Sequence, residues 1–223
     1  KAPVATVQVW YKVGSRNEVM GRAGLSHMLE HMMFKGTARY PKGSFSRIIR
    51  KNGGIDNAFT GQDFTAYFEN VAADRVGLAL ELEADRMQGL LLDHGEFQTE
   101  RDVVKEERRL RSEDDPQGAL VEALFAQVFM SHPYHWPVIG WASDIEKWKL
   151  ADLRAHFRMG YAPNNCTVVV TGAVREANVL RLARKYFEPI PRQNPPPPVH
   201  TQEPPQLGER RVTVNKPAQA PIV

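Results

Sequence analysis

Two histidines with a glutamate between them form the group of side chains best suited to chemistry. His27 and His31 are four residues apart, and Glu30 directly precedes the second of them. On an α-helix this spacing places both imidazoles on one face, one turn apart, so that they can bind the same metal ion. Glu30 projects beside them, where its carboxylate can take up or release a proton. The order His-x-x-Glu-His is the reverse of His-Glu-x-x-His, a motif in which two histidines hold zinc.

The alternative interpretation is a helix that only buries its histidines. The segment around the motif carries an apolar stripe that includes Met28, Leu29 and Met32, which indicates a partly buried helix from Leu25 to Phe34. Three polar groups on such a stripe need polar partners, because a buried polar group without one is costly. A bound metal ion supplies that partner and is the favoured interpretation.

A catalytic zinc usually has three protein ligands and keeps a fourth position for water, so one ligand must come from elsewhere. The helical pattern from 96 to 113 supplies Glu107, whose neighbours three and four positions away are largely apolar. This carboxylate is therefore expected on the buried face of its helix. The neighbours of Glu106 are charged, which predicts a solvated side chain.

Glu100 precedes Glu107 by two helical turns and shares its face. It could hydrogen-bond a ligand histidine from behind the metal. It could equally be an acidic residue of the first helical turn, favoured there by the helix dipole. The basic residues Arg108, Arg109 and Arg111 are expected to form a solvated face.

His132 and His135 form a second candidate pair, and Cys166 is the single cysteine. Pro133 and Pro137 interrupt any helix around the pair, so its histidines lack the geometry of one helical face, and a structural loop is expected. Cys166 lies in an apolar, β-branched run and is expected to be an inert core thiol.

The periodicity predicts an α+β fold, with a mixed, largely antiparallel β-sheet covered by a layer of helices in a two-layer sandwich. Turn residues separate two strand-like runs into a hairpin. The expected strands are 4–13, 56–60, 65–71 and 165–172, and the expected helices are 25–34, 45–51, 74–92, 96–113, 117–130, 150–159 and 176–187.

The domain division is expected to follow a proline-rich stretch near the end of the chain. Residues 1–190 would be the domain that carries the motif, 191–208 an extended linker, and 209–223 the start of a further half. The pattern at Arg210–Val214 predicts a strand.

Composition excludes several other classes of protein. The 29 Lys and Arg against 26 Asp and Glu leave a net charge of +3, with both signs interspersed, so a nucleic-acid-binding stripe is not expected. A nucleic-acid-binding module is considered only because the isoelectric point is near 9.0. Apolar runs are too short to cross a bilayer. With a single cysteine, no internal disulfide can form.

The motif and its surroundings resemble the pitrilysin/insulinase family of zinc metallopeptidases, the inverted zincins, which includes the β-subunit of the mitochondrial processing peptidase and bacterial zinc proteases. In that family a glutamate follows the His-x-x-Glu-His motif at a distance like that of Glu107, here 107 − 31 = 76 positions. Further matching segments are Gly24-Leu25-Ser26, Phe34-Lys35-Gly36-Thr37, Asn57-Ala58-Phe59-Thr60, Asp63-x-Thr65-x-Tyr67, His132-Pro133-Tyr134 and Tyr161-Ala162-Pro163-Asn164-Asn165.

The resemblance implies one zinc ion per catalytic half, bound by His27, His31 and Glu107. It implies that Glu30 is the catalytic base and that Glu100 supports the site. It also implies that Asn57, Ala58, Phe59 and Thr60 lie on an edge strand that receives the substrate peptide. Addition of a peptide to a sheet edge relies on main-chain hydrogen bonds and so tolerates varied sequences.

The resemblance also implies a partner, because the family's catalytic half is normally joined by a homologous second half, in the same chain or as a separate subunit. The expected protein is therefore half of a zinc endopeptidase that works as a two-half chain, a homodimer or a heterodimer. The alternative is a non-catalytic, peptide-binding or scaffold subunit. The residues themselves do not specify the cellular compartment. The resemblance favours the bacterial periplasm, and the cytoplasm is the alternative.

Overall fold

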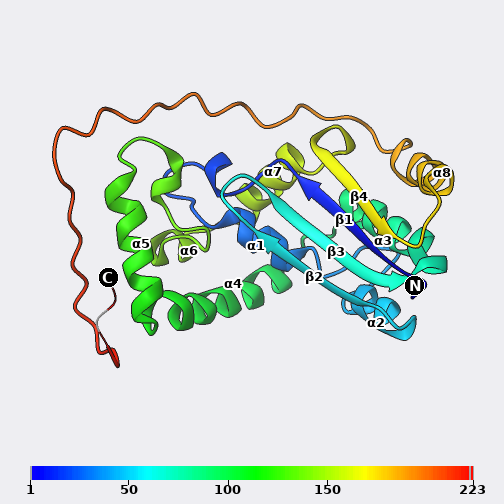
Figure 1. The fold of residues 1–223 in the computed structure, drawn as a ribbon, viewed down its shortest axis with the longest axis horizontal. Coiled ribbons are helices and arrows are strands. Elements are labelled where there is room, and N and C mark those ends of the chain that lie inside the picture. The colour runs from blue at the N-terminus through cyan, green and yellow to red at the C-terminus, as the bar shows by residue number, and fades with distance from the viewer. Residues whose placement is uncertain (1, 221, 223) are drawn as a thin grey trace.

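The chain forms one four-stranded antiparallel sheet, seen in a computed structural model that describes residues 2–220 and 222. The strand order is β2-β3-β1-β4, in which every pairing is antiparallel. The predicted α+β fold is thereby confirmed (Figure 1). The strands are β1 (Val4–Tyr11), β2 (Ile55–Thr60), β3 (Thr65–Ala72) and β4 (Cys166–Gly172). β2 and β3 form the predicted hairpin, closed by the Gly61 N–H, which donates to the Phe64 carbonyl.

Helices cover one face of the sheet, as the alternating burial along β1 requires. Ala5, Val7, Val9 and Tyr11 point into the core, and the residues between them face outward and are half-buried. In Figure 1, α1, α3 and α7 lie behind the sheet, α4 runs below it, and α8 and α5 lie at opposite ends of the molecule. The helices are α1 (Leu25–Met32), α2 (Ser44–Lys51), α3 (Val76–Gly89), α4 (His94–Arg108), α5 (Pro116–Val128), α6 (Ala142–Ile145), α7 (Leu150–Gly160) and α8 (Glu176–Phe187).

The helix predicted from 96 to 113 is divided in the structure. α4 ends at Arg108, and Arg109–Glu113 continue as one wider, π-helical turn. This turn redirects the chain into α5, whose first turn is capped by Asp115, because that carboxylate accepts from the N–H groups of Gln117 and Gly118. α5 therefore leaves the main body of the molecule and forms a separate wall (Figure 1).

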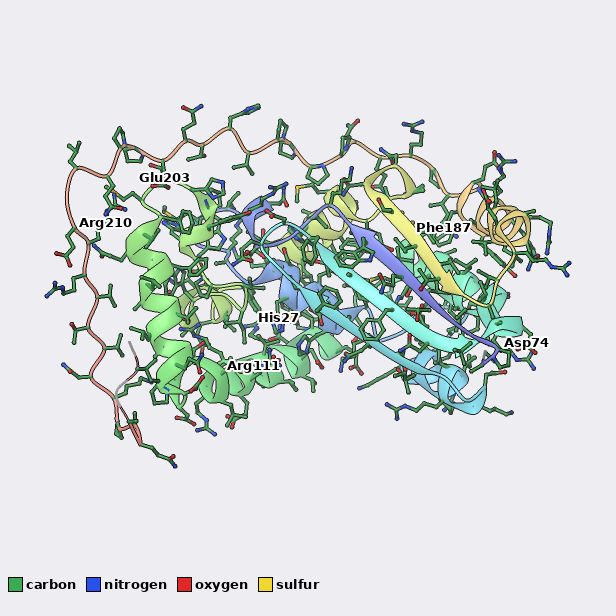
Figure 2. All side chains as sticks on the ribbon, viewed as in Figure 1. His27, Asp74, Arg111, Phe187, Glu203 and Arg210 are labelled. Atoms are coloured by element: carbon green, nitrogen blue, oxygen red, sulfur yellow. The ribbon has the colours of Figure 1, made fainter. Side chains whose placement is uncertain are left out.

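The predicted strand at Arg210–Val214 is wrong, because no other strand lies beside this segment. The chain after α8 has neither helix nor strand within the described residues. Side chains, rather than a ladder of main-chain hydrogen bonds, hold this extended segment against α5. Glu203 accepts from the N–H groups of Met130, Ser131 and His132, and Arg210 donates to the carbonyls of Gln127 and Val128 (Figure 2). The predicted further half, 209–223, lies partly outside the described residues.

A cluster of buried charges ties α3 to the sheet. Arg86 is 2% exposed and pairs with Glu83 on its own helix and with Glu69 on β3, both of which are fully buried. The guanidinium also lies over the rings of Phe45 and Tyr67, at 4.1 and 4.3 Å from their centroids. Burial and the nearby Glu83 raise the pKa of Glu69 well above its usual range.

No helix within the described residues is long and apolar enough to cross a membrane.

The buried cluster predicts that Arg86→Met strongly destabilises the chain. The substitution leaves two buried carboxylates without their cation, and loss of one partner from a buried ion pair costs about 3–5 kcal/mol. The control is Arg109→Met, because Arg109 makes the same i, i+3 pair with Glu106 at the surface, where such pairs contribute at most about 1 kcal/mol. Urea unfolding measures both changes in the free energy of unfolding. Equal, small losses for the two variants would contradict this account.

Candidate metal centre

The first turn of α1 is fixed by groups from a preceding loop and from a segment far along the chain. The buried carboxylate of Glu18 accepts from the N–H groups of Gly24 and Ser26, both at 2.6 Å, and so caps the helix. Burial raises the pKa of Glu18 to about 8, although these two hydrogen bonds favour its charged form. Gly24 has φ +95°, and a Cβ there would lie 2.4 Å from the Ile139 carbonyl oxygen. This close approach packs the loop at Ile139 against the start of α1.

α1 and α4 bring three metal-binding side chains together. The Nε2 atom of His27 lies 3.6 Å from Glu107 Oε1, and Nε2 of His31 lies 3.2 Å from Glu107 Oε2. One donor atom from each of the three residues lies within 4.8 Å of the other two. The centroids of the two imidazole rings are 4.6 Å apart with 69° between the ring planes, and both rings project from α1 towards Glu107 on α4.

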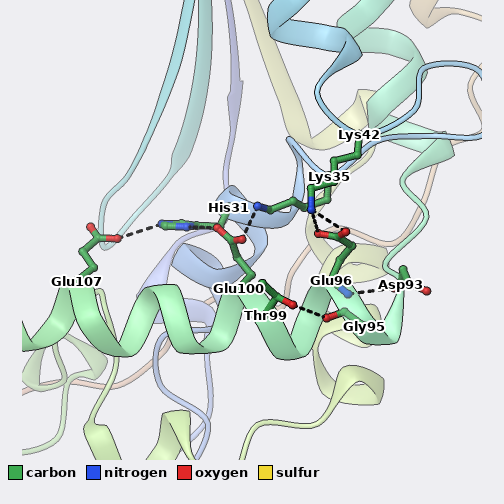
Figure 3. A network of polar contacts seen from close by, with 9 residues as sticks. All are labelled: His31, Lys35, Lys42, Asp93, Gly95, Glu96, Thr99, Glu100 and Glu107. Atoms are coloured by element: carbon green, nitrogen blue, oxygen red, sulfur yellow. Dashed lines mark hydrogen bonds and ion pairs between the residues drawn. The ribbon is translucent and has the colours of Figure 1, made fainter.

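Glu100 holds His31 from the other side of its ring. Its Oε1 atom lies 2.9 Å from His31 Nδ1, while its second oxygen pairs with Lys35 (Figure 3). In the neutral imidazole that a metal requires, Nδ1 donates to Glu100, and the lone pair of Nε2 is then directed towards Glu107 and the space between the ligand residues. Of the two interpretations of Glu100, this contact favours support of the site, because the residue lies in the second turn of α4 and contacts a candidate ligand.

The electrostatics of the site favour a cation. Burial lowers the pKa of His31, but hydrogen bonds to Glu100 and Glu107 outweigh it and raise the pKa to about 9. The imidazoles of His27 and His31 hold the pKa of Glu107 well below its usual range. Despite partial burial, His31 and Lys35 also lower the pKa of Glu100. Two carboxylates are thus kept ionised around one partly buried imidazole.

The donor set fits zinc. Two imidazole nitrogens and one carboxylate oxygen are among the ligands that catalytic zinc takes, and this set leaves a fourth position free. The Nδ1 atom of His27 is buried and lacks a hydrogen-bond partner in the described part of the chain. This nitrogen is not the one that faces Glu107, so the fit to a metal rests on the donor set of Nε2 of both histidines and the Glu107 carboxylate.

Glu30 lies next to the cluster but is held by the sheet. Its Oε2 atom accepts a hydrogen bond from the Thr60 hydroxyl, at 2.5 Å. Thr60 is the last residue of β2, the edge strand, so this bond joins the motif helix to the sheet edge. The strand register places Ala58 and Thr60 on the helix-covered face and Asn57 and Phe59 on the open face.

The cluster opens into a cleft of about 690 Å³. One side consists of the three candidate ligands, Glu30 and residues 57–60 of β2. The opposite side consists of α5 and the loop from Trp136 to Ile139. The predicted zinc ligands, the predicted base and the predicted substrate strand therefore share one cleft, whereas Glu100 lies behind His31.

The predicted solvated face of arginines is partly wrong. Arg109 and Glu106 are exposed and pair with each other. Arg108 is buried, because it packs at the junction of α4 and α5, where both its Nη atoms bond Glu122. Arg111 is exposed but reaches back one turn to Glu107, with 3.0 Å between Nη1 and Oε1.

The remaining sequence candidates lie away from the cluster. His132 precedes a short 3-10 turn and accepts the Tyr134 N–H, and His135 is the last residue of that turn. Neither belongs to a group of three metal donors among the described residues. Cys166 is half-buried, and burial raises the pKa of its thiol to about 11, which fits the expected inert thiol.

Two contributors were missed at the level of sequence. Lys35 lies four residues after His31, just beyond the end of α1 at Met32, and this short separation could have revealed it. The α5 wall carried no such signal, because its place opposite β2 depends on the π-helical turn that precedes it.

Comparison with known proteins identifies the family. Residues 1–140 match the family described as Insulinase (Peptidase family M16), and residues 147–223 match the one described as Peptidase M16 inactive domain. The chain belongs to the insulinase, or M16, peptidase family. The resemblance inferred from the motif and from Glu107 is thereby confirmed.

The relatives within the M16 family include named zinc proteases. The chain is 41% identical over 218 residues to the zinc protease PqqE of Helicobacter pylori, covering 97% of this chain and 49% of that protein. It is 30% identical over 194 residues to the mitochondrial-processing peptidase subunit beta of Lentinula edodes, covering 85% of this chain and 41% of that protein. The chain thus spans about half the length of these curated relatives.

Solved structures agree with the fold of this M16 chain. The crystal structure of a protease from Helicobacter pylori superimposes with a TM-score of 0.89 at 41% identity, covering 92% of this chain and 50% of that one. The first half of the periplasmic protease PqqL from Escherichia coli gives a TM-score of 0.80 at 22% identity, covering 88% and 44%. The second match shows the shared fold alone.

The geometry predicts different effects for three substitutions on α4. Glu107→Ala is expected to lower zinc affinity the most, because its carboxylate faces both imidazoles. Glu100→Ala is expected to lower it by roughly 10- to 100-fold, as replacement of a partner of a ligand histidine does. Glu106→Ala is the matched control and should leave zinc affinity unchanged. Zinc titration against a chelating indicator measures all three, and a larger effect for Glu106 than for Glu107 would overturn the assignment.

Proposed function

We propose that this chain is the catalytic half of a zinc-dependent endopeptidase that cleaves peptides or unfolded polypeptides. The observation that carries the proposal is the convergence of His27, His31 and Glu107 within 4.8 Å, beside Glu30 and in a cleft bordered by an edge strand. His27 and His31 would bind zinc through Nε2, and Glu107 would bind it through one carboxylate oxygen. Membership of the M16 family and the similarity to named zinc proteases support the same activity.

Zinc, when bound, supplies a Lewis acid that polarises a scissile carbonyl and activates water. The chain's own residues then handle the protons. Glu30 accepts the proton of the attacking water and returns it to the leaving amine, as a general base and then a general acid. The Thr60 hydroxyl donates to one oxygen of Glu30 and thereby orients the carboxylate while the other oxygen stays available.

The substrate would lie along β2. The outer side of this strand has no strand partner among the described residues, so its main-chain groups can pair with an extended peptide. Because Thr60 bonds Glu30, a peptide held along residues 57–60 brings its own main chain to the catalytic carboxylate. Recognition through the main chain suits an endopeptidase that accepts varied sequences.

The complete enzyme would also contain a homologous second half, as a continuation of the chain or as a partner subunit. The chain spans 49% of the length of the PqqE relative, and its candidate metal ligands line an open cleft. Residues 1–190 would form the catalytic domain, 191–208 a linker, and 209–223 the beginning of that further half.

Glu30→Gln tests the proposed role of Glu30. The amide cannot accept a proton from water but preserves the shape of the side chain, so zinc content should stay near one ion per chain while cleavage of a quenched fluorescent peptide falls at least about 100-fold. Glu106→Gln, an exposed glutamate on α4, is the control. Loss of zinc together with activity would reassign Glu30 as a ligand.

A second prediction concerns the completeness of the site. The 223-residue chain should bind zinc but cleave unstructured peptides slowly, because it holds a peptide from one side only, and positioning contributes several powers of ten to rate. Addition of a homologous second half should raise the rate without a change in zinc content. Full activity of the isolated monomeric chain would contradict the need for that half.

A further inference from the structure

The part of the cleft wall that α5 forms receives little support from the core. None of the 13 described residues of α5 is fully buried. Asp115 caps the first turn, and the pair between Glu122 and Arg108 ties the middle of the helix to α4. Four residues of α5 line the cleft, namely Gly118, Val121, Glu122 and Phe125. The position of this wall therefore depends on the contacts that hold the two ends of α5.

The C-terminal end of α5 is held by Glu203 and Arg210, which come from far along the chain (Figure 2). Glu203 accepts hydrogen bonds from the N–H groups of residues 130–132, just after α5. Arg210 donates to the carbonyls of Gln127 and Val128, at 3.1 and 2.5 Å. These carbonyls lie in the last turn of the helix, where carbonyl groups have no intrahelical partner. Both side chains are charged, so their hydrogen bonds are of the stronger, charge-assisted kind.

The N-terminal end of α5 is held by Lys216. Its ammonium group donates to the carbonyls of Ser112 and Glu113, in the π-helical turn that leads into α5. Arg210 and Lys216 are six residues apart, a separation that spans about 20 Å in an extended chain. A helix of 13 residues is also about 20 Å long. The segment between these two basic residues therefore reaches from one end of α5 to the other, and Figure 1 shows it running alongside the helix.

The side chains of this segment alternate between half-buried and exposed. Every second side chain is half-buried, namely those of Arg210, Val212, Val214 and Lys216. The three side chains between them are exposed. Such alternation is typical of an extended chain that turns one face to the protein and the other to solvent. Because the segment has no strand partner among the described residues, the alternation reflects packing of one face and not a place in the sheet.

We propose that residues 203–216 form a strap that holds α5 at both ends and thereby sets the width of the cleft between α5 and β2. Glu203, Arg210 and Lys216 are then positioning residues, because they act on the cleft through α5 and are not among the residues that line it. The strap crosses from the proposed linker into the proposed beginning of the further half. A movement of that half would therefore be transmitted to the cleft wall. This last consequence rests on the proposed function, whereas the strap itself does not.

Hydrogen–deuterium exchange of the full chain tests the strap, with matched control variants from the same segment. Glu203→Ala and Arg210→Ala each remove one set of contacts with the C-terminal end of α5. The controls are Glu209→Ala and Arg211→Ala, because these side chains are 73% and 78% exposed and pair with each other. Arg210→Lys is the conservative variant, since an ammonium group can still donate to the same carbonyls.

Exchange in peptides that cover residues 116–132 should become roughly 10-fold faster in Glu203→Ala and Arg210→Ala, because α5 opens more often once a charged partner is lost. Exchange in β1 and α1 should stay unchanged, Arg210→Lys should restore most of the protection, and both controls should match the wild type. Unchanged exchange at 116–132 would show that α5 is held without the strap. Equal acceleration in α5 and β1 would show general support of the fold. Either result overturns the proposal.

The distance between nitroxide labels on β2 and α5 measures the width of the cleft directly. Ile55→Cys and Leu124→Cys supply exposed attachment points outside the cleft lining, and Cys166→Ser removes the native thiol. Arg210→Ala should broaden the distribution of this distance, whereas Arg211→Ala should leave it unchanged. An unchanged distribution in Arg210→Ala would overturn the role of the strap in setting the cleft. None of these measurements requires peptide cleavage, so failure of the strap and failure of the proposed peptidase function are distinguishable.

Discussion

The packing of α1 against α4 is the constraint on which the site depends. α1 carries both histidines and Glu30, α4 carries Glu107 and Glu100, and neither helix holds a complete set of ligands. The sheet fixes α1 from one side, and the loop at Ile139, Glu18 and Gly24 fix its first turn from the other. With α1 held in place, two carboxylates of α4 that are two helical turns apart have different roles. Glu107 faces both imidazoles, and Glu100 contacts His31 from the other side of its ring.

This arrangement concentrates charge in a partly buried place, which is unfavourable unless a cation joins it. Glu107 is kept ionised by the imidazoles, and Glu100 is kept ionised by His31 and Lys35. In the absence of metal, a proton on His31 compensates for part of that charge, in line with a pKa of about 9. A zinc ion placed between the same atoms compensates for it more fully. The other buried group of charges, the Arg86 cluster, lies elsewhere, between α3 and the sheet.

The sequence was sufficient to predict the features that depend on local periodicity. The motif helix, the β2–β3 hairpin and the strand β1 each follow from spacing along a short segment. The expectation that Glu107 and not Glu106 faces the histidines also required only the helical period of α4, and the two residues are placed accordingly.

Features that depend on long-range contacts were not predictable in this way. The burial of Arg108 depends on its pairing with Glu122 of α5 at the junction of the two helices, and the absence of a strand at Arg210–Val214 depends on the lack of a partner strand among the described residues. The cleft wall that α5 forms is likewise a product of tertiary structure.

The central claim is that His27, His31 and Glu107 together bind one zinc ion that Glu30 does not touch. Anomalous diffraction at the zinc absorption edge, from crystals of the zinc-loaded chain, tests it most directly. The account predicts a single anomalous peak about 2.0–2.2 Å from Nε2 of both histidines and from one oxygen of Glu107, with the carboxylate of Glu30 outside the coordination sphere. A peak bound by Glu30, a peak at His132 and His135, or a cluster without zinc under saturating metal would contradict it.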